Sequence, residues 1–271
     1  MLGRLRAAGL PSDPAADRLL LAEVALTLAL SAEGERLIAA LRQAGLEVRL
    51  VKGAAFARAL YAGETRSFTD IDLLLRREDL PAAGRVLAAR DYRALRFRLK
   101  HAEGYAEEKW QRPPDSALGP LLVELHWDLI GSPTLRRGRR CDLALLRAAT
   151  PDQEQAQHLL VAAVHGALGD GFTRLQPLAD LARALSQPID YGWLGERLRA
   201  GRLEKPLALA LDLVHRCFAQ PAALEARRRL SLPAPPFWVR RLLSVPLVTA
   251  GEVTRSGWRR QLVREWLKLR H

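Results

Sequence analysis

The sequence has few cysteines, methionines and aromatic residues, and it has no long apolar run. Its 271 residues include two cysteines, one methionine and 6% aromatic residues. Cys141 and Cys217 give neither a disulfide framework nor the paired spacing of a zinc site, which fits free thiols in a reducing compartment. No apolar run approaches the length of a membrane span, and the N-terminus lacks the apolar core of a signal peptide. We therefore expect a cytoplasmic protein without a membrane partner.

Acidic residues are also scarce relative to basic ones. The 42 Lys and Arg residues exceed the 30 Asp and Glu residues, and the formal net charge is +12. From residue 221 onward, eleven Lys or Arg stand against three Glu. Such a segment is either a set of solvated helix faces or the electrostatic signature of a nucleic-acid-binding module. Because no aromatic stripe accompanies the charges at a nucleic-acid motif spacing, we favour solvated faces and keep nucleic acid as an alternative partner.

The pattern of apolar residues changes along the chain, which is long enough to bury a large core. Residues 1–45 are apolar at helical spacing and end at Gly45, which predicts an N-terminal helical cap. Residues 46–149 mix short apolar strands with helices, and residues 150–271 have helical patterns only. We therefore predict an α+β protein, with a mixed β-sheet and flanking helices in residues 46–149 and an all-helical domain in residues 150–271.

Several segments of the middle domain have the apolar pattern of β-strands. The expected strands are 47–51, 69–75 and 121–127, with a further strand at an edge in 92–98. Segment 101–114 fits either a strand or a loop and ends at a Pro-Pro pair.

Asp70 and Asp72 stand two residues apart in the second expected strand, so their side chains point to the same face. Two neighbouring carboxylates raise each other's pKa unless a cation shares the site. Mg²⁺ takes carboxylate oxygens together with substrate phosphates. Two solvated acids at a strand end are the plainer interpretation of this pair alone. Glu124 adds a third acid, because a carboxylate inside the apolar strand 121–127 is costly unless it is paired or bound to metal.

The first strand ends at Lys52-Gly53, and a short helix is expected from residue 54 to residue 61. A helix N-terminus presents backbone N–H groups and a partial positive charge, which suit a phosphate. Gly53 would let the backbone approach that phosphate closely, and Lys52 would add a point charge. Arg66 would fork onto a phosphate, with a loop ion pair as an equal alternative.

His126 follows Glu124 by two residues, so both side chains face the same side of the strand. Such a histidine either orients the acid or a ligand, or it is a buried structural residue held by hydrogen bonds.

Taken together, these residues resemble the uncharacterised nucleotidyltransferase family of the nucleotidyltransferase-fold superfamily, of the kind found beside lasso-peptide and other natural-product gene clusters. The resemblance extends from about residue 15 to beyond residue 200. The residues that carry it are Leu50-Val51-Lys52-Gly53, Leu60-Tyr61, Arg66, Asp70-Ile71-Asp72-Leu73-Leu74, Val123-Glu124-Leu125-His126-Trp127, His165 and Asp180-Leu181.

The resemblance implies transfer of a nucleotidyl or phosphoryl group from an NTP, with ATP as the expected donor and Mg²⁺ or Mn²⁺ as the cofactor. The acceptor would be a hydroxyl or phosphate of unknown identity, such as that of a modified peptide or a small molecule. The resemblance assigns the catalytic and metal-binding roles to Asp70, Asp72 and Glu124. The residues expected to bind substrate are Lys52, Gly53, Arg66 and His126.

The chain departs from the superfamily after its first strand, where Gly-Ser usually contacts the phosphates and Lys52-Gly53 stands here. A second hypothesis follows from such departures. The protein would keep the fold without the chemistry and act as a binding or regulatory protein.

Overall fold

The structure is a computed structural model that describes residues 14–62, 64–95, 104–113, 119–249 and 257–269. The chain divides into two compact units, one holding most of the β-sheet and the other holding the helices that follow it. Residues 1–13 of the helical cap predicted for residues 1–45 lie outside the described residues, as does the end of the edge strand predicted to reach residue 98. The division into three domains that the sequence suggested stays a prediction.

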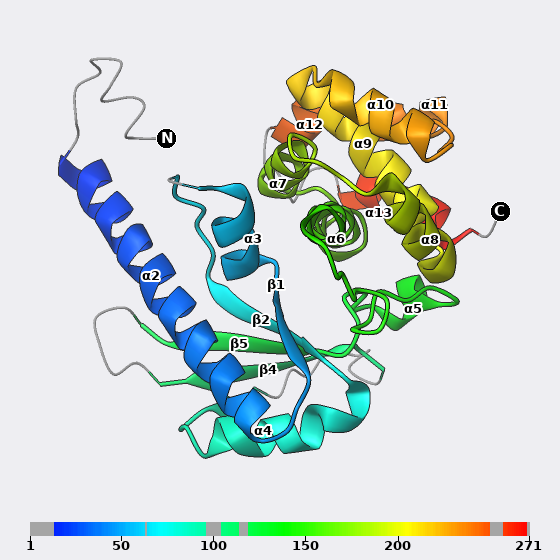
Figure 1. Cartoon of the computed structure of the whole chain (residues 1–271). Helices are drawn as coiled ribbons and strands as arrows, with labels where there is room; N and C mark the ends of the chain where they lie inside the picture. Colours follow the sequence, from blue (N-terminus) through cyan, green and yellow to red (C-terminus); the bar gives the residue numbers. More distant parts are fainter. Residues whose placement is uncertain (1–13, 63, 96–103, 114–118, 250–256, 270–271) are drawn as a thin grey trace. The chain divides into compact units, whose positions relative to one another are not determined.

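A mixed five-stranded sheet in the order β1-β2-β5-β4-β3 confirms the α+β class (Figure 1). β2 and β5 are therefore hydrogen-bonded neighbours although they are far apart in the sequence. β3 pairs antiparallel with β4, and Arg93 lies opposite Gln111. The segment that the sequence left open between strand and loop thus contains β4. The strands are β1 (Val48–Val51), β2 (Asp70–Leu75), β3 (Arg93–Ala94), β4 (Glu107–Arg112) and β5 (Leu121–His126).

Among the described residues, three α-helices belong to the sheet-containing unit. They are α2 (Pro14–Gln43), α3 (Gly53–Leu60) and α4 (Leu80–Ala88), and a 3₁₀ turn (Arg77–Asp79) precedes α4. The helix α2 packs on β1, α3 and α4 through buried leucines such as Leu37 and Leu41 (Figure 1). The chain leaves α2 at Gly45, whose φ of 80° lies in the left-handed region that favours glycine.

A buried acid on α2 connects this helix to distant parts of the same unit. Glu33 is 4% exposed. Its Oε1 accepts hydrogen bonds from Tyr92 Oη at 3.0 Å and from Arg112 Nη1 at 2.8 Å. A buried carboxylate is stable when it is paired and hydrogen-bonded, so these contacts hold α2 against β4 and the segment before β3.

The helices that follow β5 make up most of the second unit. Within it, α6 packs against α7, α8 and α9, and α9 packs against α10. In the described part of the chain, every helix is either too short or too polar to cross a lipid bilayer. The helices are α5 (Pro133–Arg136), α6 (Pro151–Val164), the π-helix η2 (His165–Asp170), α7 (Gln176–Ala184), α8 (Tyr191–Gly201), α9 (Glu204–Phe218), α10 (Pro221–Arg229), α11 (Phe237–Leu242), α12 (Val245–Thr249) and α13 (Gly257–Lys268).

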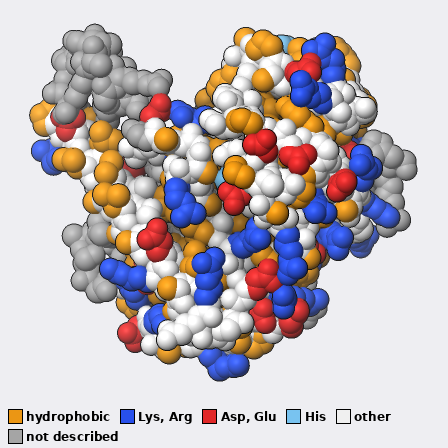
Figure 2. All heavy atoms as spheres, in the orientation of Figure 1, with side chains coloured by type: hydrophobic (Ala, Val, Ile, Leu, Met, Phe, Trp, Pro, Cys, Tyr) orange, Lys and Arg blue, Asp and Glu red, His pale blue; other side chains and the backbone are white. Residues whose placement is uncertain are grey.

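Acids of the second unit neutralise part of its basic C-terminal segment. Asp212 is buried on α9, and its carboxylate lies 2.7 Å from Arg216 Nε and 3.1 Å from Arg240 Nε. Glu225 pairs with two arginines of α10 at 2.6 and 2.9 Å. On the face drawn in Figure 2, Lys and Arg side chains are interspersed with Asp and Glu. The pairs of Glu225 are exposed, as on a solvated helix face, whereas Asp212 is buried. The nucleic-acid alternative for this segment stays a prediction.

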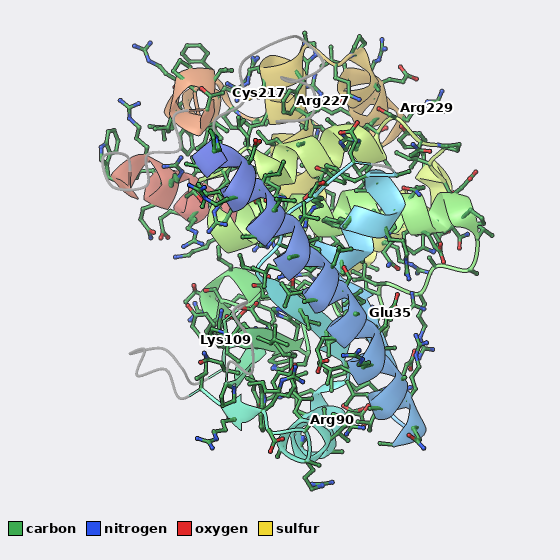
Figure 3. The ribbon with its side chains drawn as sticks, turned by 90° about the vertical axis from the view of Figure 1, so that its left-hand side faces the viewer. Glu35, Arg90, Lys109, Cys217, Arg227 and Arg229 are labelled. Carbon is green, nitrogen blue, oxygen red and sulfur yellow. The ribbon has the colours of Figure 1, made fainter. Side chains whose placement is uncertain are left out.

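The substitution Glu33→Ala should lower the free energy of unfolding by about 3 kcal/mol, because the half-buried Arg112 and the buried Tyr92 would lose a shared charged partner. Urea denaturation measures this change. The matched control is Glu35→Ala, since Glu35 is exposed on the same helix and is labelled in Figure 3. The control should stay within about 0.5 kcal/mol of the unsubstituted protein. Equal effects of the two substitutions would contradict the anchoring role of Glu33.

Candidate active site

The strand β2 carries two acids that alternate with apolar residues. Asp72 is 3% exposed, and Asp70 is partly exposed at the start of the strand. Ile71 and Leu73 point the other way and are fully buried in the core. Because side chains alternate between faces, burial of the two apolar residues fixes the direction of the two acids.

The strand β5 lies beside β2 and brings a third acid to the second. Glu124 is 6% exposed, and its neighbours Val123 and Leu125 are fully buried. One carboxylate oxygen of Asp72, one of Glu124 and a ring nitrogen of His126 lie within 4.8 Å of one another. The sheet therefore joins acids that are far apart in the sequence into one cluster of potential metal ligands.

Lys52 reaches this cluster from an unusual backbone conformation at the start of α3. Its φ of 53° and ψ of −138° lie where residues other than glycine are rarely found. Its Nζ lies 2.5 Å from Asp72 Oδ1; the Asp72 side chain is buried, and the Lys52 side chain is 12% exposed. Backbone strain of this kind costs about 1–3 kcal/mol and persists where the surrounding structure imposes it. This turn therefore places the ammonium group of Lys52 against the carboxylate of Asp72.

Lys109 is a second lysine beside these acids, and the sequence pattern did not predict it. It lies on β4, the neighbour of β5, and is labelled in Figure 3. Its ammonium group pairs with Glu124 Oε1. The Lys109 side chain is 28% exposed. The sequence shows a lysine within segment 101–114. Its pairing with Glu124 could be predicted only if that segment were known to form a strand beside β5.

Two further residues expected to bind substrate, Gly53 and Arg66, contact each other at the turn between β1 and α3. A Cβ added at Gly53 would stand 3.2 Å from the Phe68 ring, so the protein's own packing fills this space. Arg66 is buried, donates from Nη1 to the Gly53 carbonyl at 3.2 Å and lies 5.3 Å from the centre of the Phe56 ring. These contacts of Arg66 stabilise the turn between β1 and α3. Its contact with a phosphate stays a prediction.

His126 ends β5 and is buried. Its Nδ1 lies 3.8 Å from Glu107 Oε2, a carboxylate on β4. Imidazole suits Mg²⁺ less well than carboxylate does. The arrangement therefore agrees better with a histidine that positions its neighbours or a substrate than with a ligand of a hard cation.

The comparison with known families bears directly on this cluster. The profile of the uncharacterised nucleotidyltransferase family matches residues 3–219, most of the chain. The chain belongs to the uncharacterised nucleotidyltransferase family. A search of the curated proteins found no match. The family match includes β2 and β5, so Asp72 and Glu124 lie within the part of the chain that defines this membership.

The electrostatics of this cluster of acids and lysines leave an excess of negative charge. Burial, followed by the charges of Asp72 and Glu124, raises the pKa of Asp70 to about 6 from its ordinary 3.8, against the opposing effect of Lys52 and Lys109. Burial alone would lower the pKa of Lys52, but the nearby carboxylates outweigh it, and the pKa is raised. Lys52 is therefore charged at neutral pH. The three carboxyl groups of Asp70, Asp72 and Glu124 lie near only two ammonium groups, those of Lys52 and Lys109. The site can therefore accept a further positive charge.

Without divalent cations, the Asp70 carboxyl should titrate with a pKa of about 6 in a carboxyl-carbon NMR experiment. Asp72→Asn should lower this pKa, because a neighbouring negative charge is removed. The exposed control Glu35→Gln should leave it unchanged. A pKa near 3.8 would contradict the crowding of acids described above.

The same shift has a consequence for stability. Because the folded protein binds the Asp70 proton more tightly than the unfolded chain does, this group stabilises the fold fully below the unfolded pKa of 3.8. That contribution is lost as the pH rises through about 6.

Proposed function

We propose that the protein is a Mg²⁺- or Mn²⁺-dependent nucleotidyltransferase. It moves a nucleotidyl group from an NTP, with ATP as the first candidate, to a hydroxyl or phosphate of a peptide or small molecule. The observation that carries the proposal is the approach of the Asp72 and Glu124 carboxylates to within 4.8 Å, from two neighbouring strands of the sheet. Membership of the nucleotidyltransferase family supports the reaction class.

The residues of the cluster suit a hard divalent cation. Carboxylate oxygens are the ligands that Mg²⁺ and Mn²⁺ prefer. The raised pKa of Asp70, caused by burial and by two further acids, indicates that the lysines do not fully neutralise the cluster. We assign the cation to Asp70, Asp72 and Glu124. When bound, the cation would neutralise charge on the transferring group and its leaving group.

The remaining residues would bind and orient the reactants. Lys52, at the N-terminus of α3, would provide a positive charge for the triphosphate where the superfamily usually has a serine. Arg66 and Gly53 would set the conformation of the turn that holds this lysine. Glu124 would either bind the cation or accept the proton of an acceptor hydroxyl, and His126 on the same strand would orient it.

Labelled ATP separates nucleotidyl from phosphoryl transfer. Attack on the α-phosphorus releases pyrophosphate and leaves the α-label on the acceptor, whereas attack on the γ-phosphorus releases ADP and leaves the γ-label there. We would incubate the protein with Mg²⁺ and α- or γ-labelled ATP, alone and with defined serine, threonine and tyrosine peptides or monosaccharides. We expect Mg²⁺-dependent release of pyrophosphate.

Asp72→Asn and Glu124→Gln should each lower this turnover by about 10²–10³-fold, because each removes a charge that stabilises the transition state. Circular dichroism should show that both variants keep the fold, and Glu35→Gln should retain full turnover as the matched control. Undiminished turnover in Asp72→Asn would reject the proposed site. If calorimetry with Mg²⁺ and each of the four NTPs showed no binding, the alternative of an inactive binding or regulatory protein would replace the proposal.

A further inference from the structure

Each of the two best-buried carboxylates of the site already holds an ammonium group. Lys52 Nζ lies 2.5 Å from Asp72 Oδ1, and the ammonium group of Lys109 pairs with Glu124 Oε1. These are oxygens of the same carboxylates that a divalent cation would use. The two lysines therefore supply the positive charge that a metal ion would otherwise supply. A divalent cation has to compete with them for the two carboxylates.

The competition depends on whether the lysines have another partner. A lysine that leaves a buried carboxylate loses a charged partner in a place with little water. A cation that enters while both lysines remain would face two like charges at short range. A triphosphate removes this conflict, because its oxygens accept hydrogen bonds from ammonium groups while the carboxylates turn to the cation.

The two lysines differ in how they would move. Lys52 is held by the turn before α3 and is 12% exposed, so its ammonium group can shift only over a short distance. Lys109 lies on β4 and has a flexible four-carbon side chain that is 28% exposed. Its ammonium group can therefore move farther than that of Lys52. Lys109 is therefore the better position at which to test the exchange.

We propose that Lys52 and Lys109 act as internal counter-ions that disfavour binding of a divalent cation until a nucleoside triphosphate is present, and that they then bind the triphosphate. This inference rests on the proposed function. It adds Lys109 to the substrate-binding residues and makes binding of cation and nucleotide mutually dependent. Such dependence is reciprocal, so each ligand strengthens the binding of the other by the same factor.

The first test uses the unsubstituted protein, with Mn²⁺ as the probe and α,β-methylene-ATP as a nucleotide that cannot release pyrophosphate. Electron paramagnetic resonance of free Mn²⁺ gives the affinity of the protein with and without the nucleotide, after correction for Mn²⁺ bound by nucleotide alone. We expect the nucleotide to tighten Mn²⁺ binding by about tenfold or more. Equal affinities in the two conditions would overturn the inference.

The second test removes one counter-ion. Lys109→Met keeps most of the length of the side chain without its charge, and it should tighten Mn²⁺ binding in the absence of nucleotide by about tenfold or more. Lys109→Arg should behave like the unsubstituted protein. Arg90→Met, at an exposed position that is also labelled in Figure 3, removes one positive charge away from the cluster and should have no effect. Unchanged or weaker Mn²⁺ binding in Lys109→Met would overturn the inference.

Thermal unfolding provides a readout for a variant that is less stable. Lys109→Met leaves Glu124 without this lysine, so it should unfold at a lower temperature than the unsubstituted protein, and Mn²⁺ alone should reverse the loss. If Lys109→Met does not fold even with Mn²⁺, the measurement on the unsubstituted protein decides the question.

The outcomes separate this inference from the function on which it rests. If Mn²⁺ binds in no variant, with or without nucleotide, both the metal-dependent function and this inference fail. If Mn²⁺ binds to the unsubstituted protein, is lost in Asp72→Asn and is insensitive to the nucleotide and to Lys109→Met, the inference alone fails.

Discussion

The pairing of β2 with β5 places two buried carboxylates side by side, and the remaining features of the site follow from that constraint. Asp72 and Glu124 are each close to fully buried, where an unpaired charge is strongly disfavoured. The sheet fixes their separation, so the protein must supply positive charge at that point. It does so with Lys52 from the turn after β1 and Lys109 from β4.

The two lysines come from segments that other contacts hold in place, namely the turn after β1 and the strand β4. Lys52 has a left-handed φ, and the buried Arg66 supports its turn by binding the carbonyl of Gly53. β4 is held from the other side by Arg112, which binds the buried Glu33 of α2. The scaffold that positions the lysines therefore extends well beyond the acids they neutralise.

Much of the fold could be predicted from the sequence because its signals are local. Apolar residues alternating with Asp70 and Asp72 indicated β2, and an acid within an apolar run marked Glu124 as unusual. The left-handed Gly45 ended α2 where the sequence placed a stop. The family resemblance was confirmed by the match over residues 3–219.

Other features depend on strand order, which local patterns do not encode. β4 is half-buried along its length and alternates poorly, so segment 101–114 gave no clear strand signal and Lys109 was overlooked. The contacts of Arg66 with Gly53 and Phe56 depend on how the loop folds back, and a phosphate ligand was therefore an equally good hypothesis. The strained backbone of Lys52 likewise has no sequence signal, because glycine would have been the expected residue there.

Anomalous diffraction from crystals grown with Mn²⁺ and α,β-methylene-ATP would locate the cation and the triphosphate relative to the two lysines. We expect a manganese peak next to carboxylate oxygens of Asp72 and Glu124, with the ammonium groups of Lys52 and Lys109 in contact with the triphosphate. A manganese peak bound elsewhere, or a triphosphate bound while both lysines remain on their carboxylates, would contradict this expectation.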